Sequence, residues 1–291
     1  MNTPTVPFGD QKRLRAHFGR AAFGFTRLPF RKNVAAEQMF DSTSQRELLH
    51  GLMMWFELRG LALVTGPTGV GKSITLRRFL RGLSEDRASV LYFGQIPTTR
   101  TGFLRALCRR LELRPRQHIA DMFDDARTRL RDWRERHGAW PVLVLDDAEG
   151  MAAATLDLVR RLTAADLDSD DRFAVLLVGT EQLLRTLAEP SLAPLRTRFG
   201  YARTLRAFSV EDTRNYVRFH LRHAEVADDL FSEDALREVF QASAGVPRAI
   251  NQLAVQALID AVVRGVDQID GRLMQQVIHA HPLYASVSKR A

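Results

Sequence analysis

The stretch Gly66-Pro67-Thr68-Gly69-Val70-Gly71-Lys72-Ser73 has the form G-x-x-x-x-G-K-S and follows the apolar run at 61–64. Its three glycines allow the backbone to wrap so that N–H groups face a phosphate, and the helix expected to begin near Gly71 adds its positive end. In such a loop the lysine reaches the β- and γ-phosphates and the serine hydroxyl ligates Mg²⁺. The sequence therefore predicts a site for ATP and Mg²⁺ that is made by residues 66–73 and Ile74.

A carboxylate for the metal follows the most strand-like segment of the chain, residues 142–145. Four aliphatic residues followed by an acidic one are typical of a central parallel strand whose carboxyl end lies at a ligand crevice. We therefore expect Asp146 to lie on the metal side of the site. The alternative is a strand that ends in an Asp capping a helix.

Strand-like and helix-like segments alternate through the first two thirds of the chain, which predicts an α/β sandwich with a parallel sheet. From Ser209 onward the pattern is helical, with caps expected at Ser209 and Ser232 and a helix that begins at Pro247. The predicted parts are a basic N-terminal arm (1–40), a nucleotide-binding core (41–207), a small all-helical lid domain (208–282) and a C-terminal tail (283–291). The aromatic residues of the arm are expected to dock on the core.

The composition is that of an ordinary globular protein, with 291 residues, 45% hydrophobic and 26% charged. Cys108 is the single cysteine, so an intramolecular disulfide is excluded and a reducing compartment is favoured. The histidines and the cysteine lack the spacing of a zinc site. Because no apolar run approaches the roughly 18 residues of a membrane span, we expect a cytoplasmic protein with no membrane partner.

Positive charge is concentrated in the N-terminal part of the chain. Residues 1–120 contain 20 Lys and Arg against 8 Asp and Glu, a net charge of +12, whereas residues 121–291 carry a net −4. This asymmetry favours a polyanion, and nucleic acid in particular, as a partner, although a solvated or subunit-facing basic surface would give the same pattern. The residues expected to contact the DNA backbone are Thr99, Arg100, Thr101 and Arg105. Threonines that cap an ordinary turn are the alternative interpretation.

Five sequence segments together resemble the AAA+ ATPases, and more narrowly their ExeA/TniB-like group, whose relatives include the transposition helper ATPases MuB, IstB and TnsC. These segments are 66–73, 142–147, 179–182, 195–199 and 245–251, and the resemblance covers about residues 20–280. It implies a three-layer P-loop AAA+ sandwich with a parallel sheet, followed by a helical lid.

The resemblance also implies roles for single residues. Thr180 matches sensor 1, Arg248 matches sensor 2, and Arg198 matches the arginine finger that a neighbouring subunit supplies, with Arg196 as the second candidate. Asp147 stands where many such ATPases carry the glutamate that activates water. Because aspartate is one methylene shorter, slow, assembly-stimulated ATP hydrolysis is predicted, with Glu149 either compensating or merely exposed.

For a transposition helper the resemblance implies a homo-oligomeric ring or filament that forms on target duplex DNA with ATP and recruits or activates a DDE transposase. Alternative functions are an envelope- or secretion-associated ExeA-like ATPase, a replication-initiator type, and a weakly hydrolysing ATP-switch scaffold. A small-molecule kinase or GTPase is a further alternative, and the lack of an N-K-x-D motif argues against guanine specificity.

Overall fold

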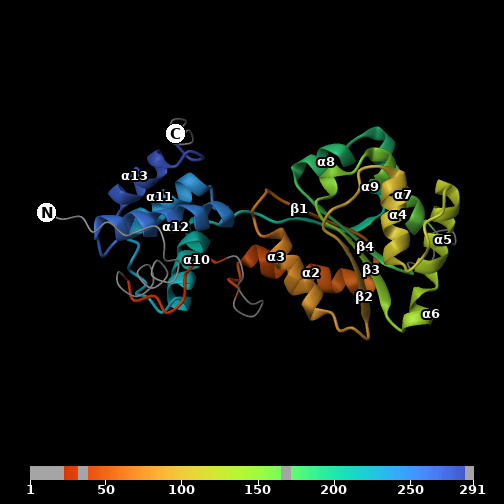
Figure 1. The fold of residues 1–291 in the computed structure, drawn as a ribbon, viewed down its shortest axis with the longest axis horizontal. Coiled ribbons are helices and arrows are strands. Elements are labelled where there is room, and N and C mark those ends of the chain that lie inside the picture. Colours follow the sequence, from red (N-terminus) through yellow and green to blue (C-terminus); the bar gives the residue numbers. More distant parts are fainter. Residues whose placement is uncertain (1–22, 32–38, 165–171, 286–291) are drawn as a thin grey trace, which may run out of the picture. The chain divides into compact units, whose positions relative to one another are not determined.

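The computed structural model describes residues 23–31, 39–164 and 172–285. The chain divides into two compact units, one of residues Thr43–Arg206 and one made of Met1–Ser42 and Ala207–Ala291. Figure 1 shows an α/β unit and an all-helical unit, and each is described by itself below. The breaks lie near the predicted boundaries at 40/41 and 207/208, and the division into four parts stays a prediction.

The α/β unit alternates helices and strands along its length. Its elements are α2 (Thr43–Leu58), β1 (Gly60–Thr65), α3 (Lys72–Gly82), β2 (Ala88–Phe93), α4 (Arg100–Arg110), α5 (Ile119–Arg131), α6 (Trp133–His137), β3 (Trp140–Leu145), η3 (Ala148–Gly150), α7 (Ala153–Thr163), β4 (Ala174–Gly179), α8 (Glu181–Leu187), η5 (Pro190–Leu192), α9 (Ala193–Arg196) and β5 (Phe199–Thr204).

The strands form one five-stranded sheet in the order β2-β3-β4-β1-β5, and each neighbouring pair is parallel. Strands β1, β3 and β4 lie inside the sheet and are almost continuously apolar, as expected when helices cover both faces. Because the strands are parallel, their carboxyl ends meet at one edge of the sheet. This arrangement confirms the predicted α/β fold with a parallel sheet.

Alternate residues of the strands face two helical layers. Leu63, Leu143 and Leu177 belong to a core shared with α4, α5, α7 and α8. On the opposite face lie α2 and α3, which meet through Trp55 and Phe79, with ring centroids 6.3 Å apart. Figure 1 shows these two helices on one side of the sheet and α4, α7, α8 and α9 on the other. The α/β unit is thus a three-layer sandwich.

The second unit contains α10 (Val210–His223), α11 (Glu233–Ser243), α12 (Pro247–Arg264) and α13 (Gly271–Ala280). Both predicted serine caps are confirmed: the Ser209 hydroxyl accepts the N–H of Asp212 in a capping box, and the Ser232 hydroxyl accepts the N–H of Ala235. Pro247 occupies the first turn of α12, where its missing N–H costs no hydrogen bond.

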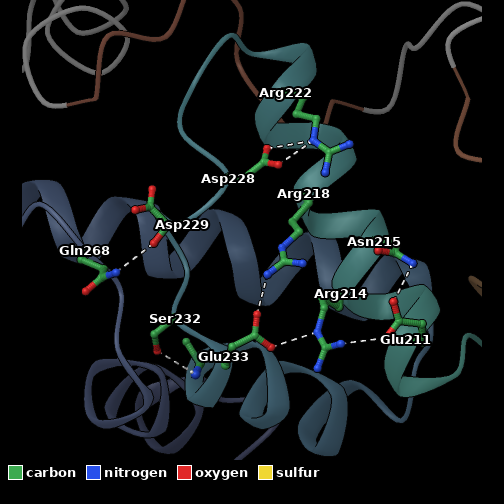
Figure 2. A network of polar contacts seen from close by, with 11 residues as sticks. Glu211, Arg214, Asn215, Arg218, Arg222, Asp228, Asp229, Ser232, Glu233 and Gln268 are labelled. Carbon is green, nitrogen blue, oxygen red and sulfur yellow. Dashed lines mark hydrogen bonds and ion pairs between the residues drawn. The ribbon is translucent and has the colours of Figure 1, made fainter.

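Ion pairs on the surface join α10 to the elements that follow it. Figure 2 shows Arg214 between Glu211 and Glu233, Arg218 also directed at Glu233, and Arg222 bonded to Asp228. The participating side chains are partly exposed, so each pair contributes at most about 1 kcal/mol. The stability of this unit therefore comes mainly from its apolar core.

The described part of the N-terminal arm packs into the helical unit. Phe25 and Phe30 are buried in its hydrophobic core, the N–H of Thr26 donates to Ala224 O at 3.2 Å, and the N–H of Phe30 donates to Nδ1 of His220 at 3.3 Å. The sequence predicted docking on the nucleotide-binding core instead. Burial of these apolar rings in the core of the helical unit removes them from water, which is the physical reason for docking there. The basic residues before position 23 lie outside the described residues.

Candidate functional site: the carboxyl edge of the sheet

The phosphate loop joins β1 to α3 and depends on three glycines. Gly66, Gly69 and Gly71 have φ of 154°, 83° and 110°, a region that other residues adopt only with strain. A Cβ at Gly66 would lie 2.6 Å from the carbonyl oxygen of Leu205, which follows β5. The loop therefore owes its path both to glycine conformations and to close packing against neighbouring backbone.

Lys72 is the first residue of α3, and its side chain turns back into the loop. Its Nζ donates to the carbonyl oxygens of Gly66 at 2.7 Å and Pro67 at 3.1 Å, and the residue is 8% exposed. The positive charge that a triphosphate needs is thus held within the loop, together with the N-terminal end of α3. Ser73 is exposed and Ile74 half-buried in the first turn of the helix.

Asp146 directly follows β3 and is 4% exposed. Its backbone N–H donates to Phe93 O at 2.9 Å, which ties it to the end of β2. Its Oδ1 accepts the N–H of Asp147 at 3.1 Å, and its Oδ2 accepts the hydroxyl of Tyr92 at 2.8 Å. Burial, helped by this bond and by the charges of Asp146 and Asp147, raises the pKa of Tyr92 to about 12.

The donor set at this edge fits Mg²⁺, which prefers oxygen ligands. An ionised carboxylate has about four lone-pair positions, so Asp146 retains acceptor capacity beyond its two hydrogen bonds. The Ser73 hydroxyl supplies a second oxygen. Among the residues that the structure describes, no group of three or more His, Cys, Asp or Glu side chains is placed to hold a metal ion.

Asp147 and Glu149 are held differently. Asp147 is exposed and has φ of 55°, an uncommon left-handed conformation for a residue other than glycine. Glu149 lies in η3, is half-buried, and its Oε2 accepts the N–H of Thr180 at 3.3 Å. Thr180 follows β4 and is the N-cap residue of α8, so Glu149 reaches the next strand of the sheet and is not merely an exposed residue.

The three arginines with expected roles in the site belong to different segments of the chain. Arg196 Nη1 donates to the carbonyl oxygens of Leu187 at 2.8 Å and Glu189 at 3.2 Å, so this guanidinium caps the end of α8. Arg198 is half-buried just before β5. Arg248 is exposed in the first turn of α12, in the helical unit. The roles of all three stay predictions.

The residues expected to contact DNA lie where α4 begins. The Thr99 hydroxyl accepts the N–H of Gly102 at 3.1 Å and caps the helix, as the alternative interpretation of these threonines expected. Arg100 and Arg105 are exposed on α4 and Thr101 is half-buried. A contact between these side chains and DNA stays a prediction.

Two residues at the site were not identified from the sequence. Tyr92 lies on the strand paired with β3, and only the strand register reveals that it reaches Asp146. Gln45 is buried in α2, and its Nε2 lies 3.1 Å from where a Cβ at Gly71 would be. No sequence pattern indicates that either residue reaches this site, because both approach it through the packing of distant segments.

Comparison with known proteins agrees with this geometry. Residues 57–187 match the protein family described as AAA domain. The fold is similar to those of Cdc6p from Pyrobaculum aerophilum (20% identity, TM-score 0.56, 87% of this chain and 67% of that one) and the ORC2 protein from Aeropyrum pernix (16%, 0.57, 91% and 71%). It is also similar to the RuvB Holliday junction branch migration motor of Thermotoga maritima (17%, 0.54, 86% and 72%).

The parallel sheet, the phosphate loop and the similarity to these structures define the class of fold: this chain has the P-loop AAA+ fold. The chain is similar, with 29% identity over 251 residues, to general secretion pathway protein A of Aeromonas hydrophila. The alignment covers 85% of this chain and 45% of that relative, so this chain spans less than half of the relative's length. Over the described ranges, no helix has the length and apolar character needed to cross a membrane.

Proposed function

We propose that this chain binds ATP with Mg²⁺ at the carboxyl edge of its sheet and hydrolyses it slowly, as a switch that responds to assembly. The observation that carries this proposal is the convergence of three strand ends. The phosphate loop follows β1, Asp146 follows β3 and Thr180 follows β4, and β4 pairs with both other strands. A carboxylate and a loop built for phosphates thereby share one edge.

We assign a separate role to each residue of the site. Lys72 and the backbone of the loop bind phosphate, and Ser73 and Asp146 are the oxygen ligands for Mg²⁺, which neutralises phosphate charge when bound. Asp147 orients the attacking water. The hydrogen bond between Glu149 and the N–H of Thr180 holds these two residues in place near Asp147. Arg198 of a neighbouring copy adds positive charge at the γ-phosphate and so couples hydrolysis to assembly.

The test is nucleotide binding and turnover by the purified chain. Wild-type protein is expected to bind a fluorescent ATP analogue, to gain thermal stability with MgATP, and to hydrolyse it below the typical enzyme turnover of about 10 per second. Lys72→Ala is expected to lose both binding and stabilisation. Arg81→Ala is the matched control, because it removes a positive charge from the last turn of the same helix. Absence of wild-type binding would refute the proposal.

One observation favours a role in the envelope, namely the similarity to general secretion pathway protein A. On this second candidate function, the ATPase supplies nucleotide-dependent force or assembly to a secretion apparatus. Cell fractionation with quantitative immunoblotting tests it. Enrichment of the protein in the envelope fraction, reduced in Lys72→Ala, would support the secretion-associated function. Recovery of the protein together with nucleic acid, with no enrichment in the envelope fraction, would argue against this function.

The transposition-helper function is the other candidate, and it rests on the N-terminal concentration of positive charge and on the ExeA/TniB-like resemblance. On this function the chain forms rings or filaments on duplex DNA with ATP and contacts a DDE transposase. Co-sedimentation with duplex DNA in ATP, ADP and no nucleotide tests it. Arg100→Ala and Arg105→Ala should weaken binding and reduce its salt dependence, whereas Arg185→Ala, on α8, should not. DNA binding that depends neither on the nucleotide nor on these two substitutions would argue against the transposition-helper function.

A further inference from the structure

Tyr92 connects the edge of the sheet to the predicted metal ligand. It is the next-to-last residue of β2, which lies at one end of the strand order, and it pairs in register with Val144. Its hydroxyl crosses to the end of β3 and donates to Oδ2 of Asp146 at 2.8 Å. Since the N–H of Asp146 also bonds to Phe93 O, the two strand ends are joined by a backbone bond and a side-chain bond.

The two oxygens of Asp146 have different donors. Oδ1 accepts the N–H of Asp147 from the same chain segment, whereas Oδ2 depends on Tyr92. A carboxylate held at both oxygens cannot rotate freely about its terminal torsion, so its remaining lone pairs keep a fixed direction. Without the tyrosine hydroxyl, one oxygen of this buried group would lose its described side-chain donor.

The ring of Tyr92 is also open to the surface. It is 38% exposed and lines a groove of about 780 Å³ between α3 and β2. Ser73, the other predicted oxygen ligand, lines the same groove. Tyr92 therefore contacts one predicted metal ligand, Asp146, through its hydroxyl and lines the same groove as the other, Ser73.

We propose that Tyr92 is a positioning residue for Asp146. The Tyr92 hydroxyl holds the Asp146 carboxylate in the orientation that binds the Mg²⁺ of the bound nucleotide. This inference rests on the proposed ATP site. A partner that orients a metal ligand changes metal affinity by about 10- to 100-fold when it is removed. Tyr92 is not expected to contact the phosphates, so nucleotide affinity in the absence of metal should not depend on its hydroxyl.

The test is a magnesium titration of Tyr92→Phe with binding, and not turnover, as the main readout. The affinity for a fluorescent ATP analogue is measured in EDTA and then at increasing Mg²⁺. Tyr92→Phe is expected to match wild type in EDTA but to need about 10-fold more Mg²⁺ for half of the metal-dependent gain in affinity. Tyr201→Phe on β5 removes a hydroxyl from the same sheet and should leave both values unchanged. An unchanged magnesium midpoint in Tyr92→Phe would overturn the inference.

A double-mutant cycle with Asp146→Asn separates positioning from general damage. If the hydroxyl acts through the carboxylate, Tyr92→Phe should change the magnesium midpoint in the wild-type background and have little further effect in the Asp146→Asn background. Equal effects in both backgrounds would mean that Tyr92 acts elsewhere and would refute the inference. Thermal melts establish that each variant is folded. Failure of the wild type to bind nucleotide would instead refute the proposed ATP site itself.

Discussion

The Glu149 carboxylate accepts a hydrogen bond from the backbone N–H of Thr180, with Oε2 and N 3.3 Å apart. A Cβ at Gly179 would lie 2.8 Å from the same oxygen, so the glycine before Thr180 makes room for this contact. The bond joins η3, after β3, to the end of β4. Two carboxylates that follow β3 therefore have different surroundings, with Glu149 held by a neighbouring strand and Asp147 exposed.

This difference predicts separate effects for the two carboxylates on hydrolysis. Asp147→Asn should lower kcat by about 100-fold or more, since a general base contributes about 10²- to 10⁴-fold. Glu149→Gln retains an oxygen that accepts the Thr180 N–H, and its kcat should fall by less than about 10-fold. Single-turnover hydrolysis at saturating MgATP measures both effects. Nucleotide affinity is the control and should change little, because neither side chain belongs to the phosphate loop. A larger loss of kcat in Glu149→Gln than in Asp147→Asn would identify Glu149 as the general base.

A second prediction separates the two arginines that precede β5. Arg196→Ala removes donors from the Leu187 and Glu189 carbonyls at the end of α8, so it should lower the free energy of unfolding by about 1–2 kcal/mol. Arg198→Ala should remove the stimulation of hydrolysis that rises with protein concentration. Urea unfolding and the dependence of turnover on concentration measure the two effects. Loss of stimulation in Arg196→Ala without loss of stability would make Arg196 the arginine finger.

Much of the α/β unit was predictable because its signals are local. The phosphate loop carries its own glycines, and the aliphatic run before Asp146 marks a strand that is buried on both faces. The helix expected to begin near Gly71 is α3, whose first residue is Lys72. Serine caps at positions 209 and 232 were also readable, because a cap needs only residues close in sequence.

What could not be predicted depends on contacts between distant segments. The bond from Tyr92 to Asp146 spans 54 residues and follows from strand order and register, which periodicity does not give. The docking of Phe30 against His220 likewise joins segments 190 residues apart, which local sequence patterns do not relate. The short helix α9 has only four residues and leaves no recurring apolar pattern.

The third prediction concerns the first glycine of the phosphate loop. Gly66→Ala would place its Cβ 2.6 Å from the Leu205 carbonyl oxygen. Because this oxygen belongs to the backbone, it cannot move away as easily as the end of a flexible side chain could. We expect the loop to shift, with a loss of about 1–3 kcal/mol in stability and a large loss of affinity for the ATP analogue. Gly138→Ala is the control, since Gly138 also has a positive φ of 75° but nothing within 4 Å of its Cβ position. It should lose stability and keep affinity. Unchanged affinity in Gly66→Ala would contradict the predicted phosphate site.

The fourth prediction is a pH dependence in the helical unit. His220 is 5% exposed, packs near Phe30 and Tyr216, and its Nδ1 accepts the N–H of Phe30, so the imidazole must be neutral there. Burial, and next the nearby charge of His223, lowers the pKa of His220 from 6.5 to about 4. Between pH 6.5 and about pH 4, His220 is therefore protonated in the unfolded chain and neutral in the folded chain. Stability is therefore fully present above pH 6.5 and falls as the pH decreases toward 4.

The size of this effect follows from the shift, because one pKa unit corresponds to about 1.4 kcal/mol and the loss should reach on the order of 3 kcal/mol near pH 4. His220→Gln cannot take up the proton, so its free energy of unfolding should depend less steeply on pH over the same interval, although it starts lower because the ring contacts are lost. Urea unfolding followed by circular dichroism at about pH 7, 6 and 5 compares the two slopes, and His279→Gln, in the last turn of α13, controls for an exposed histidine. Equal slopes for wild type and His220→Gln would show that another group titrates, and the bond from Phe30 to His220 would then have no part in the acid sensitivity of this unit.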